Sequence, residues 1–490
     1  MMDTEDRSQI SVLHVTPEIA PFSKVGGLAD VAGSLPSALY RLGADVRVMT
    51  PSWPGVTERM IEKGAEETSD PAPVCVMLRN REYCGSVRLF DLEGLKICLL
   101  EHHDLFSSTG VYPRDLDPVS VTPFAFLSLA AVEYSLYGGW KPQVLHLHDW
   151  PSSLAAAAMK WHMKYSFADG KPGTVLTIHN LAHQGTLPLS VLDDLGMGPD
   201  SFSLDGAEFY GKANLLKGGI VAADLVTTVS PNYAREMLTP EFGERLEGVL
   251  AYRNEKVSGI LNGIDTAAWD PASDGLIPAN FSIGDMKGKK VCHASLLSEC
   301  GWDGFHGPVL VSVGRLVRQK GLDILLDAMD EILSAGARIA VIGTGEGSLE
   351  EKFADASVRR PDGLHFRAAF DERFARLSYA GGDIFIMPSL FEPCGLSQMI
   401  AMRYGTVPVA RGVGGLVDTV SDADAGPRGT GFLFDDFTPE ALMSAVRRAL
   451  THFSEPRSWS QLRRRCMEKD FSWDLSARSY MTLYRSLSDQ

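Results

Sequence analysis

The sequence has few positive charges for its length and no long hydrophobic run. Among its 490 residues, Lys and Arg number 46 against 62 Asp and Glu, which gives a formal net charge of −16. A chain this acidic repels nucleic-acid phosphates and anionic lipid surfaces. No apolar stretch reaches the roughly 18 residues of a membrane-spanning helix, since the best candidate, 124–132, ends at Glu133. We therefore expect neither nucleic acid nor membrane as a partner.

Cysteine is also scarce. The seven cysteines are an odd number, and none stands in a C-x-x-C arrangement. This pattern predicts reduced thiols rather than a disulfide framework or a zinc site. The N-terminal segment MMDTEDRSQ is polar and acidic, the opposite of a signal peptide. Together these features predict a cytoplasmic protein, or one of the plastid stroma in a plant-type source, although no transit peptide is visible.

Strand-like and helix-like segments alternate along the first half of the chain. The β-branched runs 10–15 and 46–49 are typical of strands. Between them, apolar residues recur with helical spacing over 28–39, and Gly43 follows as a helix end. This order predicts a β–α–β unit and hence a parallel sheet. Further strands are expected at 97–100, 144–147, 174–178 and 225–229.

The same alternation starts again in the second half. Strands are expected at 309–313, 339–342, 384–387, 407–410 and 431–434, with an amphipathic helix at 322–333. The segment 270–307 is rich in Gly, Pro, Asp and Lys and is expected to be mostly loop. We predict an α/β protein of two Rossmann-like, doubly wound domains, 1–258 and 259–469, which face a deep interdomain cleft. Ligands of such sheets bind beyond the carboxyl ends of the strands.

Three loops that follow strands carry residues suited to a phosphate or a sugar. In Lys24-Val25-Gly26-Gly27 the glycines allow close approach of a ligand, and helix N-terminal amides with the Lys24 ammonium attract anions. In Phe391–Gln398, Glu392 stands at a strand end where a carboxylate can accept two sugar hydroxyls. Gly412–Leu416 repeats the order of strand, glycine loop and helix. A tight turn or a capping role is the alternative interpretation for each loop.

Two cations follow the first strand of the second half. Arg315 and Lys320 stand five positions apart in a glycine-containing loop. Arginine binds phosphate in a bidentate manner and lysine acts as a point charge, so the pair suits a diphosphate. No D-x-D-type acidic pair follows a strand to hold magnesium. The sequence therefore predicts a nucleotide-diphosphate sugar held by amides and cations, with no metal and no cofactor.

Three other motifs are weak evidence for a binding site. GDMKGKK at 284–290 is one residue short of a P-loop and lacks its Ser or Thr. The G-x-G-x-G at 343–347 has two interpretations, a ligand contact and a simple strand-to-helix turn. His146, His148 and Asp149 lie close in sequence, but no further His or Cys stands at ligand spacing, which disfavours a metal.

The ordered motifs resemble those of the bacterial glycogen synthases and plant starch synthases. That resemblance implies a retaining glucosyltransferase of the GT-B fold that uses ADP-glucose as donor and an α-glucan, such as glycogen or a malto-oligosaccharide, as acceptor. The matching segments are KVGGLADV at 24–31, HLHDW at 146–150, TIHNLAHQG at 177–185, TTVSPNYAREM at 227–237, LNGIDTAAWDP at 261–271, VGRLVRQKGLD at 313–323, FEPCGLSQ at 391–398 and GVGGLVDTV at 412–420.

The resemblance also implies roles for individual residues. Five are catalytic candidates. Arg315 and Lys320 bind the diphosphate and stabilise the leaving group, and Glu392 holds the glucose 3- and 4-hydroxyls. Asp149 and His179 line the glucose pocket, with the His179 carbonyl near the anomeric carbon. The remaining candidates bind substrate: Lys24, Gly26, Gly27, Asn262, Phe370, Cys394, Gly395, Leu396, Ser397, Gly414 and Gly415.

Two positions bear on the donor. Many related transferases place a second Glu eight residues after the first, where it meets the ribose. Here that position is Ile400. The synthases also lack the second Glu, so its absence disfavours the sucrose-type branch that uses UDP-sugars. The aromatic residue expected to stack on adenine is usually Tyr, whereas counting back from Glu392 gives Phe370. Stacking is kept and the phenol hydrogen bond is lost.

The chemistry predicts a front-face displacement, because no carboxylate nucleophile can be named. The resemblance to GT-B enzymes also implies that the final helix, about 470–490, packs back on the N-terminal domain through Trp473, Tyr480, Leu483 and Tyr484. The alternative is an ordinary terminal helix of the second domain. Three alternatives stay open: a synthase that prefers UDP-glucose, a catalytically silent glucan-binding homologue, and an α-glucan phosphorylase. The last is disfavoured by the short chain and by the lack of a pyridoxal-lysine signature.

Overall fold

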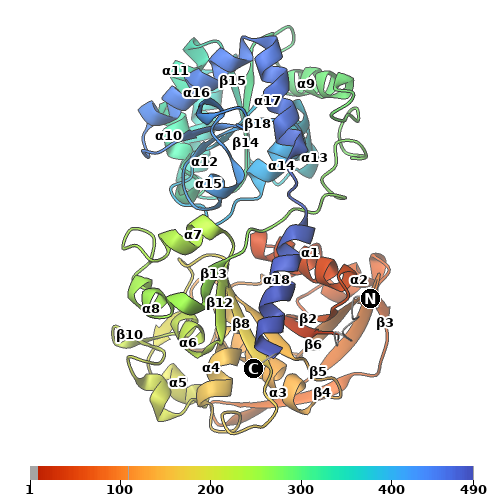
Figure 1. Cartoon of the computed structure of the whole chain (residues 1–490), viewed down its shortest axis with the longest axis vertical. Helices are drawn as coiled ribbons and strands as arrows, with labels where there is room; N and C mark the ends of the chain where they lie inside the picture. Colours follow the sequence, from red (N-terminus) through yellow and green to blue (C-terminus); the bar gives the residue numbers. More distant parts are fainter. Residues whose placement is uncertain (1–8, 109, 489–490) are drawn as a thin grey trace, which may run out of the picture. The chain divides into compact units, whose positions relative to one another are not determined.

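The computed structural model describes residues 9–108 and 110–488. The N-terminal segment through Ser8 lies outside the described residues, as do the last two positions of the predicted terminal helix. The chain forms two compact units, each with its own parallel sheet (Figure 1). Unit 1 comprises Met1–Val229, Ala234–Gly263 and Trp473–Gln490, and unit 2 comprises Ser230–Tyr233 and Ile264–Ser472. The main division thus lies at 263/264, where the sequence predicted 258/259.

Unit 1 is built on a ten-stranded sheet. Neighbouring strands from β13 (Val257–Gly259) to β6 (Leu95–Glu101) are parallel, as the β–α–β pattern predicted. At one edge β3 (Glu66–Glu67), β4 (Ala72–Leu78) and β5 (Arg81–Leu92) add antiparallel pairs. The order is β13 (Val257–Gly259), β12 (Leu225–Thr228), β8 (Gly173–Ile178), β7 (Val144–His148), β1 (Ser11–Val15), β2 (Asp45–Pro51), β6 (Leu95–Glu101), β5 (Arg81–Leu92) and β3 (Glu66–Glu67), with β4 (Ala72–Leu78) paired to β5.

The β4–β5 hairpin corrects the prediction of reduced cysteines. Cys75 and Cys84 form a disulfide and are direct partners in the hairpin register. Arg79 and Asn80 form the two-residue turn, both with left-handed φ values of 52° and 56°. Because this tight turn fixes the register, two cysteines nine residues apart in sequence come to face each other. The other five cysteines are free and buried.

Helices cover the sheet of unit 1. The apolar run noted at 124–132 is the centre of α3, whose sides are buried nearly all round, so it is a core helix. The terminal helix α18 (Trp473–Ser488) packs against α1 (Gly27–Arg41; Figure 1) and also contacts β7. Trp473, Tyr480 and Tyr484 are buried, whereas Leu483 is only half-buried. The remaining helices are α1 (Gly27–Arg41), α2 (Val56–Glu62), α3 (Thr122–Tyr137), α4 (Asp149–Trp161), α5 (Val191–Asp194), α6 (Leu215–Ala222), α7 (Pro231–Glu236, shared with unit 2) and α8 (Glu247–Tyr252).

Two smaller features complete unit 1. A short antiparallel sheet, which the sequence did not predict, consists of β10 (Glu208–Phe209), β11 (Lys212–Asn214) and β9 (Thr186–Pro188). Among the described residues no helix is both long and apolar enough to cross a membrane.

Unit 2 is built on a six-stranded sheet whose strands are all parallel to their neighbours. Its order is β16 (Leu364–Arg367), β15 (Arg338–Ile342), β14 (Val309–Val313), β17 (Ile384–Met387), β18 (Val407–Arg411) and β19 (Phe432–Phe434). The helices are α9 (Lys287–Glu299), α10 (Leu322–Asp327), α11 (Met329–Ser334), α12 (Gly347–Arg359), α13 (Glu372–Gly381), α14 (Ser397–Arg403), α15 (Gly415–Thr419), α16 (Pro439–Phe453) and α17 (Pro456–Glu468).

Two predictions for unit 2 were wrong in detail. The segment expected to be mostly loop contains the 13-residue helix α9. Its core-facing position Lys289 is buried, and the ammonium donates to the carbonyls of Ala380 and Tyr404 and to Thr406 Oγ1. Because a lysine occupies this core position, the apolar residues of α9 do not recur with a clear helical spacing in the sequence. The single helix expected at 322–333 is divided into α10 and α11 at Ala328.

Candidate active site

In unit 1 the loop after β1 is organised by a carboxylate that the sequence did not single out. Glu18 is 2 % exposed. Its Oε2 accepts from the backbone N–H groups of Val25 (2.5 Å) and Gly26 (3.1 Å), and its Oε1 accepts from the Tyr112 hydroxyl at 3.1 Å. Burial raises the pKa of Glu18 above its usual value, although these hydrogen bonds oppose the rise. Glu18 therefore fixes the glycine loop at the start of α1.

This arrangement changes the expectation for the glycine loop. The sequence predicted that helix N-terminal amides would attract an anion here, and the Val25 and Gly26 amides just before the helix already donate to Glu18. The Lys24 ammonium forms an ion pair with Asp30, with Nζ 2.7 Å from Oδ1, and its side chain stays 44 % exposed. Gly27 begins α1. Lys24 and Gly27 are exposed and Gly26 is half-buried, so solvent reaches the predicted residues of this loop although the Val25 and Gly26 amides are occupied.

Asp149 and His179 are brought together at the ends of β7 and β8. Asp149 has a left-handed φ of 56° at the junction of β7 and α4, a conformation that a non-glycine residue rarely adopts. Its Oδ1 accepts from the His179 backbone N–H at 2.6 Å, and the Asn180 backbone N–H also donates to the carboxylate. Burial raises the pKa of Asp149 to about 7, against the effect of these two donors. The carboxylate is therefore tied to the chain that follows β8.

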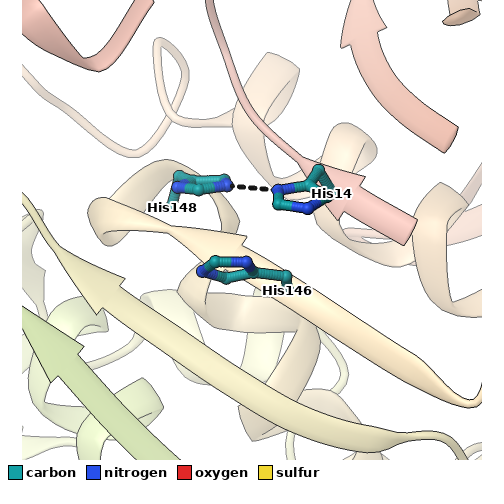
Figure 2. A group of neighbouring side chains, drawn as sticks. All are labelled: His14, His146 and His148. Atoms are coloured by element: carbon teal, nitrogen blue, oxygen red, sulfur yellow. Dashed lines mark hydrogen bonds between the residues drawn. The ribbon is translucent and has the colours of Figure 1, made fainter. Parts of the chain in front are cut away.

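The His179 ring belongs to a buried histidine chain. Figure 2 shows His14, His146 and His148 gathered on neighbouring strands, with His14 Nδ1 3.0 Å from His148 Nε2. His148 Nδ1 lies 3.0 Å from His179 Nε2. Burial lowers the pKa values of His14 and His179 to about 3 and those of His146 and His148 well below 6.5. The four rings are therefore neutral at physiological pH.

The histidine cluster has the geometry of a hydrogen-bonded core. Both ring nitrogens of His146 are engaged, Nδ1 with the Tyr484 hydroxyl and Nε2 with Thr177 Oγ1, each at 2.6 Å. Although His14, His146 and His148 are close enough to share an ion, His146 would have to give up a hydroxyl partner to bind one. The Asp149 carboxylate is engaged with backbone amides. We interpret the rings of His14, His146 and His148 as structural support for the end of β7.

Asn262 is the predicted sugar ligand of unit 1 outside these loops. It is 6 % exposed, and within residues 9–108 and 110–488 its side-chain Oδ1 meets no hydrogen-bond donor. A buried carbonyl oxygen without a donor is costly unless a ligand supplies one. This oxygen is suited to accept from a hydroxyl group.

In unit 2 the strongest feature is an ion pair between two predicted catalytic residues. Lys320 Nζ lies 2.6 Å from Glu392 Oε2, and the same oxygen accepts from Ser389 Oγ at 3.0 Å. Glu392 is 5 % exposed. Lys320 follows β14, and Glu392 follows the adjacent strand β17. The parallel sheet thus joins residues 72 positions apart at its carboxyl edge.

The second glycine loop lies directly against the Glu392 segment. The Gly415 N–H donates to the Glu392 carbonyl at 3.0 Å. Gly414 has φ 48°, and a Cβ built there would come within 1.8 Å of that same carbonyl oxygen. A Cβ at Gly415 would meet the Cys394 carbonyl at 2.4 Å. Glycine is therefore required at both positions for the two loops to approach each other.

The remaining predicted residues of unit 2 occupy different environments. Arg315 is exposed, and in the part of the chain that the structure describes its guanidinium forms no hydrogen bond or ion pair. Phe370 is 95 % exposed in the loop between β16 and α13. Cys394 is buried, whereas Gly395, Leu396 and Ser397 are half-buried at the start of α14.

The structure thus assembles the predicted residues in separate groups. Unit 1 joins Asp149 with His179, and unit 2 joins Lys320 and Glu392 with the glycine loop 412–416. Glu18, Tyr112 and Ser389 were missed. Glu18 stands three residues after β1, which is a usable signal, whereas Tyr112 is far away in sequence and no local pattern marks it.

Comparison with known proteins extends over nearly the whole chain. Residues 11–252 match the starch synthase catalytic domain, and residues 307–452 match the glycosyl transferases group 1. Glycogen synthases of Anaeromyxobacter sp. (strain Fw109-5) and Myxococcus xanthus (strain DK1622) are each 41% identical to this chain. The alignments cover 98% of it and 100% and 99% of those proteins, respectively.

Solved structures agree with the sequence comparison. The catalytic domain of starch synthase IV from Arabidopsis thaliana, bound to ADP and acarbose, is 31% identical with a TM-score of 0.90 and covers 99% of this chain and 100% of that one. A sucrose-phosphate synthase from Thermosynechococcus elongatus has 18% identity and a TM-score of 0.57, over 98% and 99% of the two chains. At that identity the likeness concerns the fold alone.

Proposed function

Because the chain belongs to the bacterial glycogen synthase and plant starch synthase family of glycosyltransferases, we propose that it transfers glucose from ADP-glucose to the non-reducing 4-hydroxyl of an α-1,4-glucan with retention of configuration. Its fold of two α/β units with parallel sheets is the GT-B fold. The solved relative with 31% identity was bound to ADP and to acarbose, which supports an adenine nucleotide and a glucan-like acceptor.

The observation that carries the proposal is the cationic cluster beyond β14. Breaking the anomeric C–O bond leaves negative charge on the departing diphosphate. Arg315 has a guanidinium without a protein partner among the described residues, and Lys320 stands in the same loop. Stabilisation of developing charge by fixed cations is commonly the largest contribution to such a reaction. In the proposal these two residues supply it, so no metal ion is needed.

Glu392 has the chemistry of a sugar ligand. Its Oε2 is held by Lys320 and Ser389, which orients the buried carboxylate. The other oxygen, Oε1, remains for substrate. We assign it to the glucose 3- and 4-hydroxyls, and we assign Cys394, Gly395, Leu396, Ser397, Gly414 and Gly415 to the surrounding donor contacts.

Unit 1 contributes the remaining sugar contacts in this proposal. Asp149 and the His179 carbonyl face the glucose, and the donor-less Oδ1 of Asn262 accepts one of its hydroxyls. Lys24, with Gly26 and Gly27, contacts the donor phosphate by exchanging Asp30 for phosphate, since the Lys24–Asp30 pair is half-exposed. Phe370 stacks on the adenine, which its 95 % exposure permits.

The reaction is a front-face displacement. The acceptor 4-hydroxyl oxygen bonds to the anomeric carbon on the side from which the diphosphate leaves. The C–O bond to the β-phosphate breaks, and the hydroxyl proton passes to the departing phosphate oxygen. ADP is the leaving group, and the configuration is retained without a glycosyl-enzyme intermediate.

The test compares Arg315→Ala with Arg318→Ala. Arg318 is also an exposed arginine of this loop, and the proposal gives it no role. Transfer of labelled glucose from ADP-glucose to glycogen should fall by a factor of about 100 to 1,000 in Arg315→Ala, on the scale of losing one charge-stabilising group, and should stay unchanged in Arg318→Ala and with EDTA. Full turnover of Arg315→Ala would contradict the proposed role, and a trapped glycosyl-enzyme would contradict the front-face step.

A further inference from the structure

At a hairpin tip of unit 1 an exposed tyrosine packs against a half-buried phenylalanine. The hairpin joins β10, which is labelled in Figure 1, to β11. Its two turn residues are Tyr210 and Gly211. The Tyr210 side chain is 68 % exposed. Its ring centroid lies 4.8 Å from that of Phe209, nearly edge-to-face.

Tyrosine is an unfavourable residue for this turn. Tyr210 has φ 49° and Gly211 has φ 77°, as in a type I′ turn, where asparagine, aspartate or glycine is preferred at the first position. A bulky residue with positive φ is strained. The ring is thus presented to solvent at a conformational cost that an asparagine would avoid.

A second strained segment holds a cation against the same ring. Glu244 and Arg245 are consecutive non-glycine residues with left-handed φ values of 49° and 68°. The Arg245 guanidinium carbon lies 3.8 Å from the Tyr210 ring centroid, within cation–π distance. The stacked guanidinium leaves part of the ring open while it fixes the ring orientation.

Two polar side chains, the half-buried Gln184 and the buried Asn214, connect the two segments. Gln184 Nε2 donates to the Glu244 carbonyl at 3.0 Å, and Asn214 Nδ2 donates to Gln184 Oε1 at 2.6 Å. Asn214 is fully buried, and its Oδ1 also accepts from the Lys217 N–H at the start of α6. Gln184 stands five positions after His179 in the same loop. The aromatic pair is therefore fixed to the segment that continues from the proposed glucose pocket.

We propose that Phe209, Tyr210 and Arg245 form a binding platform for an α-glucan chain, separate from the donor residues. A pyranose ring has C–H bonds on its faces, which pack on an aromatic ring, and hydroxyls at its rim, which accept from a guanidinium. An uncharged polymer also suits a protein with a net charge of −16. The choice of glucan as ligand rests on the proposed function.

The test uses Tyr210→Asn in the full chain. Asparagine removes the ring and suits the turn, so the thermal unfolding midpoint should stay the same or rise. The Kd for maltoheptaose, measured by calorimetry without donor, should increase about tenfold, the scale of one lost stacking contact, and migration in a glycogen-containing native gel should be less retarded. Tyr252→Ala, which removes another exposed tyrosine of unit 1, should bind as the wild type does.

Each outcome decides the question. An unchanged Kd in Tyr210→Asn, wild-type protein that does not bind maltoheptaose, or Tyr210-dependent binding of AMP in its place would overturn the platform. Tyr210-dependent glucan binding in a chain that transfers no glucose would overturn the proposed transfer reaction and leave the platform intact.

Discussion

Lys320 and Glu392 form an ion pair, with Nζ 2.6 Å from Oε2, at the carboxyl edge of the sheet of unit 2. The carboxylate is 5 % exposed and has Ser389 as a second donor. Removing one partner would leave the charge of the other without its counter-charge in a largely buried environment. The two residues therefore act as one unit, although they are proposed to contact different parts of the donor.

The pairing predicts strongly non-additive kinetics. Lys320→Ala and Glu392→Gln should each lower kcat/KM for glucose transfer by a factor of about 100 or more. The double variant should be little worse than the poorer single variant, because the first substitution already disrupts the partner. Effects that multiply in the double variant would show that the two side chains act independently.

Substitution of Asn262 should weaken substrate binding and have little effect on the free energy of unfolding. Its Oδ1 has no donor within the described part of the chain, so Asn262→Ala breaks no hydrogen bond at that atom and should shift the free energy of unfolding by less than about 1 kcal/mol. The KM for ADP-glucose should rise. Asn214→Ala is the matched control: its side chain caps α6, and its loss should cost about 1 kcal/mol. An equal loss of stability in both variants would contradict the ligand role.

Activity should depend on the ionisation of Asp149. Burial raises its pKa to about 7, so the carboxylate is protonated below that pH and ionised above it. The ionised form is the better acceptor for the His179 and Asn180 amides and for a sugar hydroxyl. We expect kcat/KM to rise with pH through about 7 in the wild type, and a lower, flat profile in Asp149→Asn. A wild-type profile that is flat between pH 6 and 8 would contradict this role.

The buried histidines should make the fold acid-sensitive. His14 and His179 have pKa values lowered to about 3, whereas an unfolded histidine titrates near 6.5. Between these values the unfolded state binds more protons, so the stabilising contribution is complete above about pH 6.5 and is lost as the pH falls toward 3. Asp149 acts in the opposite direction, because its raised pKa makes stability fall as the pH rises from about 4 toward 7.

A variant isolates the histidine contribution. His14→Asn removes one titrating ring, and its unfolding free energy should depend less steeply on pH between 4 and 6, by about 1.4 kcal/mol per pH unit. Denaturant unfolding at several pH values, compared with the wild type at each, measures the difference. Identical slopes would mean that His14 is protonated in the folded protein.

Local patterns predicted most of the parallel framework. The strand at 309–313 and the strand at 384–387 coincide with β14 and β17, because buried parallel strands are short apolar runs bounded by turn residues. Features that depend on contacts between residues distant in sequence were not predicted. The Cys75–Cys84 disulfide depends on the register of a hairpin, and α9 was hidden by the buried Lys289.

The residues of the candidate site likewise fall into those that local sequence patterns predict and those that depend on tertiary packing. Residues in strand-end loops, such as Lys320 and Glu392, stand out because parallel sheets collect such loops at one edge. Glu18 accepts from the Val25 and Gly26 amides of the loop in which the sequence predicted an anion site, and its contact with Tyr112 spans 94 positions. Which of several nearby polar groups satisfies an amide depends on tertiary packing, and no local spacing encodes it.

The most direct test of the central claim supplies labelled ADP-glucose and labelled UDP-glucose in parallel to the wild-type chain with glycogen as acceptor. β-Amylase, which cuts only α-1,4 links from non-reducing ends, then digests the product. We predict that ADP-glucose is the better donor and that the label is released as maltose. Label in glycogen from UDP-glucose alone would contradict the donor, label resistant to β-amylase would contradict the linkage, and no label from either donor would contradict the transfer itself.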